Sequence, residues 1–180
     1  KANEALVKLL SDPEPNVRAA VLKQWAEKPT LQMLPELKKY VATERDADLL
    51  VHAVRVLSEL KADTGPLLIG LMKHEAWQVR AEAAEVLAKS IKDHSSSGGS
   101  QDERKADAYA AFVERLGDED GFVASRAVEG LRDTDLPAAL KPLLDLAKSR
   151  PELAPAVIDV VVDSEGYRRG ATANLREFSK

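Results

Sequence analysis

An internal repeat of about 31 residues is the feature that most limits how this chain can fold. When the sequence is compared with itself at an offset of 62 residues, Val17 coincides with Val79 and Arg18 with Arg80. A further copy lies between these two, with apolar residues at positions 37, 41, 49, 53 and 57. A repeat of this length is typical of stacked supersecondary units, none of which can bury its apolar face alone.

Each copy contains the pattern of two short amphipathic helices joined by a turn. In residues 65–91, Pro66 suits the first turn of a helix, and apolar residues follow at helical spacing as far as Met72. A second stripe begins at Val79 and continues through Ala83 and Leu87. We call the first helix of each pair helix A and the second helix B. Two such helices leave much apolar surface in water, so each pair needs neighbouring pairs.

Five copies can be placed along the chain. We expect them at residues 3–28, 31–61, 65–91, 108–132 and 136–162. They predict a single array over residues 1–163, interrupted by a flexible, Ser/Gly-rich insertion at residues 92–107. Residues 164–180 are expected to be a C-terminal tail or the start of a further repeat. The predicted fold class is therefore all-α.

The turns and helix starts resemble those of HEAT and HEAT-like (PBS-lyase-type) repeats. The resemblance rests on a proline-led helix A, on an Asp in the turn, as at Asp12, and on a Val-Arg pair opening helix B, as at Val79 and Arg80. It implies a right-handed α-solenoid of about five helical hairpins, in which the turn Asp and the Arg form a hydrogen-bonded ladder along the array. The ladder is expected to be incomplete, because three copies have another residue in place of Arg: Leu50, Ala124 and, approximately, Pro155.

Composition excludes several classes of site. The chain has no cysteine, so disulfides, thiol catalysis and zinc–thiolate sites are absent. A net charge of −4 without a clustered basic excess argues against nucleic-acid binding. The longest apolar run, Val157 to Val162, is too short for a membrane span. We expect a soluble protein and slightly favour the cytoplasm, although the absence of cysteine does not fix the compartment.

Individual residues add smaller expectations. Trp25 falls on a helix B core position, whereas Trp77 precedes a Val-Arg pair and either packs on the next repeat or stays half exposed. Asn16 is a plausible N-cap for the first helix B. The last repeat is apolar on more than one side, so either the tail, through Leu175 and Phe178, or a missing further repeat should cover it. The chain is interpreted as a fragment or mature form of a longer protein.

No catalytic set of residues is visible. The three histidines, His52, His74 and His94, are not at metal-ligand spacing with one another, so the paired His-Glu sites of HEAT-like di-iron enzymes are not expected. His74 takes the place of the turn Asp and suits a hydrogen-bonding role at the surface. No Ser-His-Asp set, phosphate-binding glycine loop or dinucleotide motif occurs, and no cofactor or metal is expected.

The repeats favour a non-catalytic protein–protein interaction scaffold that presents a concave helical surface to a protein or peptide partner. The candidate contact residues are Arg18, Arg55, Trp77, Arg80, Glu82, Glu85 and Arg126. Alternatively, Arg18 and Arg80 are occupied in the ladder. A second hypothesis makes the chain a repeat segment of a larger multidomain enzyme, where it spaces or regulates a catalytic domain. A HEAT-like nucleic-acid-binding protein is the third.

Overall fold

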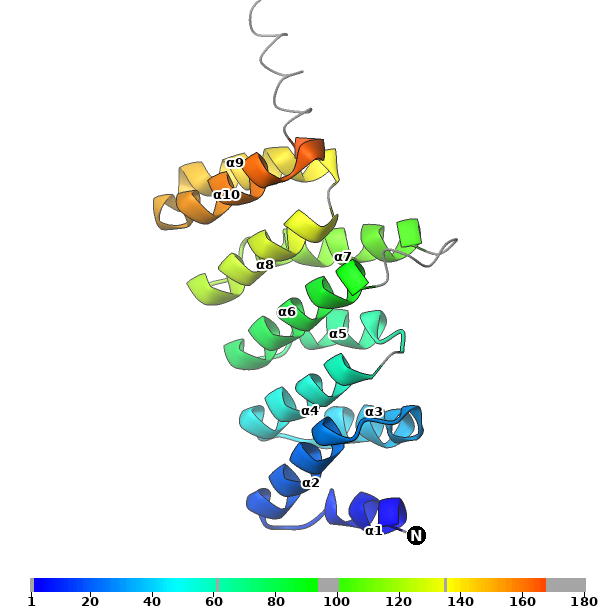
Figure 1. Ribbon diagram of the computed structural model, residues 1–180. Helices are drawn as coiled ribbons and strands as arrows, with labels where there is room; N and C mark the ends of the chain where they lie inside the picture. The colour runs from blue at the N-terminus through cyan, green and yellow to red at the C-terminus, as the bar shows by residue number, and fades with distance from the viewer. Residues whose placement is uncertain (1, 61, 94–100, 135, 168–180) are drawn as a thin grey trace, which may run out of the picture. The chain divides into compact units, whose positions relative to one another are not determined.

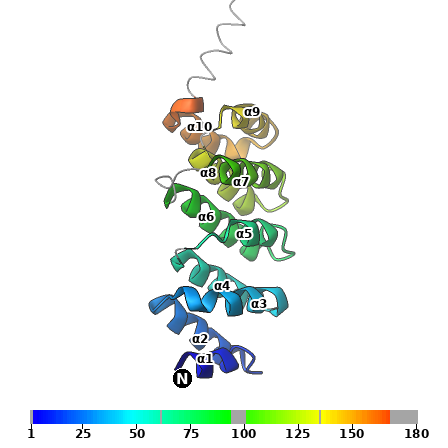
Figure 2. The ribbon, with the colours of Figure 1, turned by 90° about the vertical axis from the view of Figure 1, so that its right-hand side faces the viewer.

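The computed structural model describes residues 2–60, 62–93, 101–134 and 136–167. Every regular element in these ranges is a helix, and the described residues contain no β-strand, which confirms the all-α prediction. The chain divides into two compact units, residues 1–86 and residues 87–180. Each unit consists of helical hairpins in two layers, with the A helices in one layer and the B helices in the other (Figures 1 and 2).

The first unit contains three A helices: α1 (Ala2–Leu9), α3 (Leu34–Thr43) and α5 (Gly65–Leu71). Its B helices are α2 (Pro15–Glu27), α4 (Ala47–Glu59) and the part of α6 (Trp77–Asp93) up to residue 86. Helix α1 packs on α2 and α3 on α4, and α2 and α4 contact each other as neighbouring B helices. The short 3₁₀ turn Leu31–Met33 leads into α3.

The core of the first unit follows the predicted stripes. Trp25 of α2 and Leu57 of α4 occupy the same repeat position, and their exposed fractions are 0% and 1%. Leu37 of α3 is also fully buried. The prediction that Trp25 belongs to the core is confirmed, because the position faces the neighbouring layer in each copy of the repeat.

Helix starts in the first unit differ from expectation at one point. The predicted N-cap Asn16 is wrong: α2 begins at Pro15 and its N-cap residue is Glu14, because proline at the first helical position starts the helix two residues earlier. In α4, by contrast, the Asp46 side chain accepts hydrogen bonds from the backbone N–H groups of Asp48 and Leu49 and caps the helix.

The described part of the second unit contains two complete hairpins. Helix α7 (Gln101–Arg115) packs on α8 (Gly121–Thr134), α9 (Leu140–Ser149) packs on α10 (Ala154–Asp163), and α8 contacts α10. The 3₁₀ turns Pro137–Ala139 and Pro151–Leu153 precede the last two helices, which are ten residues long each, and each of these turns begins at a proline.

The expected insertion is partly helical. Helix α6 continues to Asp93 and α7 begins at Gln101, so only residues 94–100 of the 92–107 segment are outside the described residues. The charged residues after position 101 are good helix formers, and this explains why α7 starts earlier than the predicted repeat boundary at 108.

The end of the second unit is anchored by Tyr167. This side chain is fully buried, and its hydroxyl donates a hydrogen bond to the backbone carbonyl of Leu131 in α8. On α10, Ile158 and Val162 are 58% and 57% exposed. The predicted docking of Leu175 and Phe178 concerns residues outside the described part of the chain.

Candidate functional site

Four turns between an A and a B helix share one hydrogen bond. In each turn a side chain accepts a hydrogen bond from the backbone N–H group two residues further on. The acceptor residues are Asp12, Glu44, His74 and Asp118, at distances of 2.9, 3.0, 3.0 and 3.0 Å. This bond fixes the turn that aims helix B, and its acceptor in the third repeat is Nδ1 of His74, as expected for a hydrogen-bonding role.

The arginines of the Val-Arg pairs hold these turns from helix B. Arg18 donates from Nη1 to the carbonyls of Asp12 and Pro13, at 2.8 and 3.2 Å. Arg80 donates from Nη1 to the carbonyls of His74 and Glu75, at 3.0 and 2.8 Å, and is only 6% exposed. Carbonyls at the end of a helix lack intrahelical partners, so the guanidinium satisfies groups that the fold would otherwise leave open.

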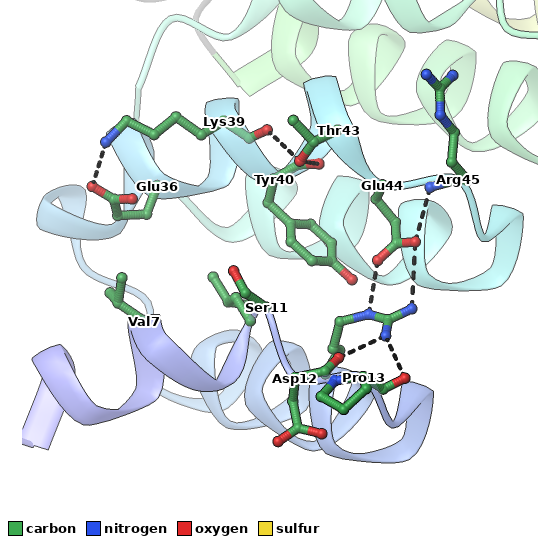
Figure 3. A pocket seen from close by; sticks show the side chains of 12 residues that line it. Val7, Ser11, Asp12, Pro13, Glu36, Lys39, Tyr40, Thr43, Glu44 and Arg45 are labelled. Atoms are coloured by element: carbon green, nitrogen blue, oxygen red, sulfur yellow. Dashed lines mark hydrogen bonds and ion pairs between the residues drawn. The ribbon is translucent and has the colours of Figure 1, made fainter.

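Arg18 also connects the first repeat to the second. Its Nε donates to Oε2 of Glu44 at 2.9 Å, and the exposed fractions of the two side chains are 15% and 9% (Figure 3). Burial alone would raise the pKa of Glu44, but the neighbouring Tyr40 hydroxyl, the backbone N–H groups of Asp46 and Arg45 and the Arg18 guanidinium lower it overall. The Glu44 carboxylate is therefore held in its charged form.

In the fourth repeat, the donor to the turn carbonyl comes from a different residue. Ala124 stands where the helix B arginine would be, and Arg150, the C-cap residue of α9 in the next repeat, donates from Nη1 to the carbonyl of Asp118 at 2.9 Å. Arg150 has the same position in its repeat as Glu44 has in the second. The guanidinium is thus supplied by the turn of the next repeat instead of by helix B of the same repeat, and the turn carbonyl has a donor in both cases.

A pocket of about 470 Å³ opens beside the Arg18–Glu44 pair in the first unit (Figure 3). Its walls come from α1, the Asp12–Pro13 turn, the start of α2, α3 and the loop after α3. The Tyr40 side chain lies at the polar end and is 6% exposed, and its hydroxyl interacts with both Arg18 and Glu44. Burial raises the pKa of the Tyr40 phenol, and the nearby Glu44 carboxylate raises it further, so the hydroxyl keeps its proton.

Two predicted contact residues lie together on the B-helix surface of the first unit. Arg55 of α4 donates from Nε and Nη2 to the two carboxylate oxygens of Glu82 in α6, at 3.0 and 3.1 Å. The Arg55 side chain is 56% exposed and Glu82 is 18% exposed. Hydrogen bonding to Glu82 raises the pKa of Arg55, and the exposed Glu85 adds to this effect.

The other candidates are distributed. Arg18 and Arg80 have equivalent places in different repeats, where each binds the carbonyls of its turn. A structural role for these two arginines was the alternative to a contact role in the sequence analysis. Trp77, the first residue of α6, is 42% exposed. Arg126 belongs to the second unit, where its guanidinium carbon lies 4.7 Å from the centre of the Phe122 ring.

Tyr40 and Glu44 were not among the predicted site residues. Tyr40 belongs to an apolar helix A stripe and reads as a core residue, and Glu44 lies in a charged segment that reads as a solvated loop. A usable signal was nonetheless present: Glu44 precedes Leu49 by the five residues that separate Asp12 from Val17.

Neither a cluster of metal-ligating side chains nor a membrane-spanning helix occurs in the described part of the chain. In the four described ranges, no group of three or more His, Asp or Glu side chains is placed to hold a metal ion. Among the helices of those same ranges, none has both the length and the apolar character needed to cross a membrane.

Comparison with known proteins agrees with this architecture. The family model of HEAT repeats matches residues 66–158, just over half of the chain. A crystal structure of an engineered protein is also similar: the match covers 95% of this chain and 76% of the engineered chain, with a TM-score of 0.54 and 19% sequence identity. This likeness concerns the fold alone. A search of curated proteins finds no match. The matched repeats, together with the helical hairpins and arginine-braced turns, show that this chain belongs to the HEAT repeat family.

Proposed function

We propose that this chain is a non-catalytic scaffold that binds a protein or peptide partner through its B-helix surface. HEAT repeats are commonly protein-interaction scaffolds. The observation that carries the proposal is the Arg55–Glu82 pair, which links two consecutive B helices at the surface of the first unit.

The geometry of the pair suits recognition. Two parallel hydrogen bonds fix the Arg55 guanidinium, yet more than half of the side chain remains in contact with solvent. An arginine that is already ordered loses less conformational entropy when a partner binds, and arginine is enriched among residues that dominate binding energy. Glu85 lies on the next turn of α6 after Glu82 and is exposed, so a partner would meet charges of both signs.

The test compares two charge reversals of equal size. Arg55→Glu changes the B-helix surface, and Lys38→Glu changes an exposed residue of α3 in the A layer. The intact chain and both variants are used as baits in lysate of the source organism, with chemical cross-linking and mass spectrometry. We expect one or more partners to be retained by the intact chain and by Lys38→Glu and to be lost with Arg55→Glu.

Two results would contradict the proposal. In the first, no protein is retained reproducibly by the intact chain. In the second, retention is unaffected by Arg55→Glu and abolished by Lys38→Glu, which would place the contact surface on the A layer.

A further inference from the structure

The last hairpin carries neighbouring apolar side chains at its surface. Leu144 of α9 is 43% exposed, and Ile158 and Val162 of α10 are 58% and 57% exposed. Ile158 and Val162 are four residues apart, so they lie one above the other on the same side of the helix. Scattered exposed apolar residues are common, but adjacent ones mark a surface that another segment covers.

Burial along the stack shows which side of α10 is uncovered. Helix α8 packs on α7 and on α10, so it has neighbours before and after it, and seven of its 14 residues are buried. Helix α10 packs on α8 and α9, which both precede it, and two of its ten residues are buried. Asp163 of α10 approaches Arg132 of α8 at 3.8 Å. Ile158 and Val162 lie about 140° and 100° around the helix from Asp163, away from the side that faces α8.

The charges around this surface are acidic. Asp159, Asp163 and Glu165 are exposed, and residues 154–167 contain no basic residue. A second copy of the chain packed through the same face would bring identical carboxylates against these. Like charges repel each other, so the surface favours an occupant that is both apolar and basic.

The segment that follows α10 has this composition. Its charged residues include one acid, Glu177, and four bases: Arg168, Arg169, Arg176 and Lys180. A helix over residues 167–180 would be about 20 Å long, and α10 is about 15 Å long. The segment is therefore long enough to cover the exposed side of α10.

The apolar residues of the segment continue a helical stripe that begins at Tyr167. Residues 165–167 are helical, and the Tyr167 side chain is fully buried, with its hydroxyl bonded to the carbonyl of Leu131. Ala171, Leu175 and Phe178 follow Tyr167 by four, eight and 11 residues. In a helix that continues from residue 167, these side chains share the side on which Tyr167 packs.

We propose that residues 168–180 form the next helix of the stack and lie antiparallel along α10. Ala171, Leu175 and Phe178 cover the exposed apolar side chains of the last hairpin, and the basic residues lie near the carboxylates of α10. The contact buries apolar surface and pairs opposite charges, both of which favour it. It does not involve the Arg55 surface, so it is independent of the scaffold proposal.

A single spin label tests the position of the segment. The chain has no cysteine, so Ser179→Cys supplies one thiol for a nitroxide in the full ¹⁵N-labelled chain. Amide intensities are compared with the label oxidised and reduced. Antiparallel packing brings residue 179 to the start of α10, so we expect residues 152–154 to lose more intensity than residues 160–163. A segment that points away from α10 would give the reverse order.

A mixed sample distinguishes the chain's own segment from that of a second copy. Spin-labelled chain without ¹⁵N is mixed with an equal amount of ¹⁵N-labelled chain that carries no label. We expect no loss of intensity in α10, because the contact lies within one chain.

Two serine substitutions at equally exposed sites test the contact surface. Ile158 and Leu31 are both 58% exposed, but Leu31 belongs to the first unit. Amide hydrogen exchange in residues 171–178 reports the ratio of undocked to docked segment. We expect Ile158→Ser to raise these exchange rates about fivefold and Leu31→Ser to leave them unchanged.

Three results would overturn the proposal. In the first, residues 152–154 are unaffected by the label or lose less intensity than residues 160–163. In the second, α10 loses intensity in the mixed sample, which would identify a second copy as the occupant. In the third, Ile158→Ser changes the exchange rates no more than Leu31→Ser does.

Discussion

At the scale of single residues, one glycine sets the distance between two helices. A Cβ atom built on Gly130 of α8 would lie 2.4 Å from two ring atoms of Phe112 in α7, a side chain that is fully buried. Gly70, in contrast, is exposed near the end of α5, and a Cβ atom there would meet nothing within 4 Å. A larger residue therefore does not fit at position 130, whereas position 70 has room for one.

We expect Gly130→Ala to destabilise the protein and Gly70→Ala to stabilise it. Overpacking a core of this kind lowers the free energy of unfolding by about 1–3 kcal/mol, and the better helix propensity of alanine returns only about 1 kcal/mol. At Gly70 the propensity gain of about 0.5–1 kcal/mol acts alone. Thermal unfolding of both variants measures the effect. Equal melting temperatures would mean that α7 and α8 are not in close contact at this point.

A second residue-scale prediction concerns acid. The folded state lowers the pKa of Glu44 below its ordinary value of 4.5, so ionised Glu44 adds stability above that pH, and this contribution is lost as pH falls through the lowered value. Glu44→Gln keeps an oxygen that accepts the turn hydrogen bonds and removes the charge. We expect this variant to be less stable than the parent chain by about 1–2 kcal/mol at pH 7, with a difference that shrinks below about pH 4.

Urea unfolding at pH 7, 5, 4 and 3 gives the required free energies for both chains. A difference that stays constant over this range would show that the Glu44 charge makes no net contribution. Exposed carboxylates titrate in both chains alike and cancel in the comparison.

At the scale of elements, the junctions between hairpins are closed by two mirror arrangements. In the first unit the guanidinium of Arg18 comes from helix B and the carboxylate of Glu44 from the next turn. In the second unit the helix B position is Ala124, and Arg150 of the next turn supplies the guanidinium. Both arrangements give a donor to the backbone carbonyl of the turn residue that follows the A helix, Asp12 or Asp118.

This equivalence predicts that the second arrangement can be converted into the first. Arg150→Glu alone removes the donor to the Asp118 carbonyl, and Ala124→Arg alone places a second guanidinium beside it. We expect each single variant to be destabilised by about 1–3 kcal/mol, whereas the double variant should recover at least about 1 kcal/mol of the summed loss, because the new Arg and Glu can pair.

A double-mutant cycle on unfolding free energies measures the coupling. The control cycle combines Ala124→Arg with Lys148→Glu, a change of an exposed residue in the last turn of α9, and should show no coupling. Additive effects in the first cycle would refute the equivalence of the two junctions.

At the scale of the whole molecule, the sequence periodicity was enough to predict the helical hairpins but not the side-chain contacts between them. The repeat of apolar positions predicted the order of A and B helices and the buried place of Trp25. The sequence identified Asp12 as a turn residue and His74 as its replacement, but not Glu44, because the longer carboxylate that accepts the same hydrogen bond lies in a charged segment interpreted as a solvated loop.

The remaining contacts depend on geometry that a single repeat does not contain. Arg150 could not be assigned from the fourth repeat, since it belongs to the fifth. The apolar stripe placed Tyr40 correctly in helix A but gave no sign that its hydroxyl interacts with Arg18 and Glu44, because that contact exists only in the folded chain.

The two junction types also mean that the hairpins of this chain are not interchangeable building blocks. If the fifth hairpin followed the first, Arg150 would meet Arg18 at one carbonyl, and two like charges would compete for it with no acid between them. Which hairpin can follow which is therefore set by the side of the junction that carries the arginine. Duplicated or shuffled hairpins would be tolerated only where each junction still has one arginine and one group that accepts its hydrogen bond.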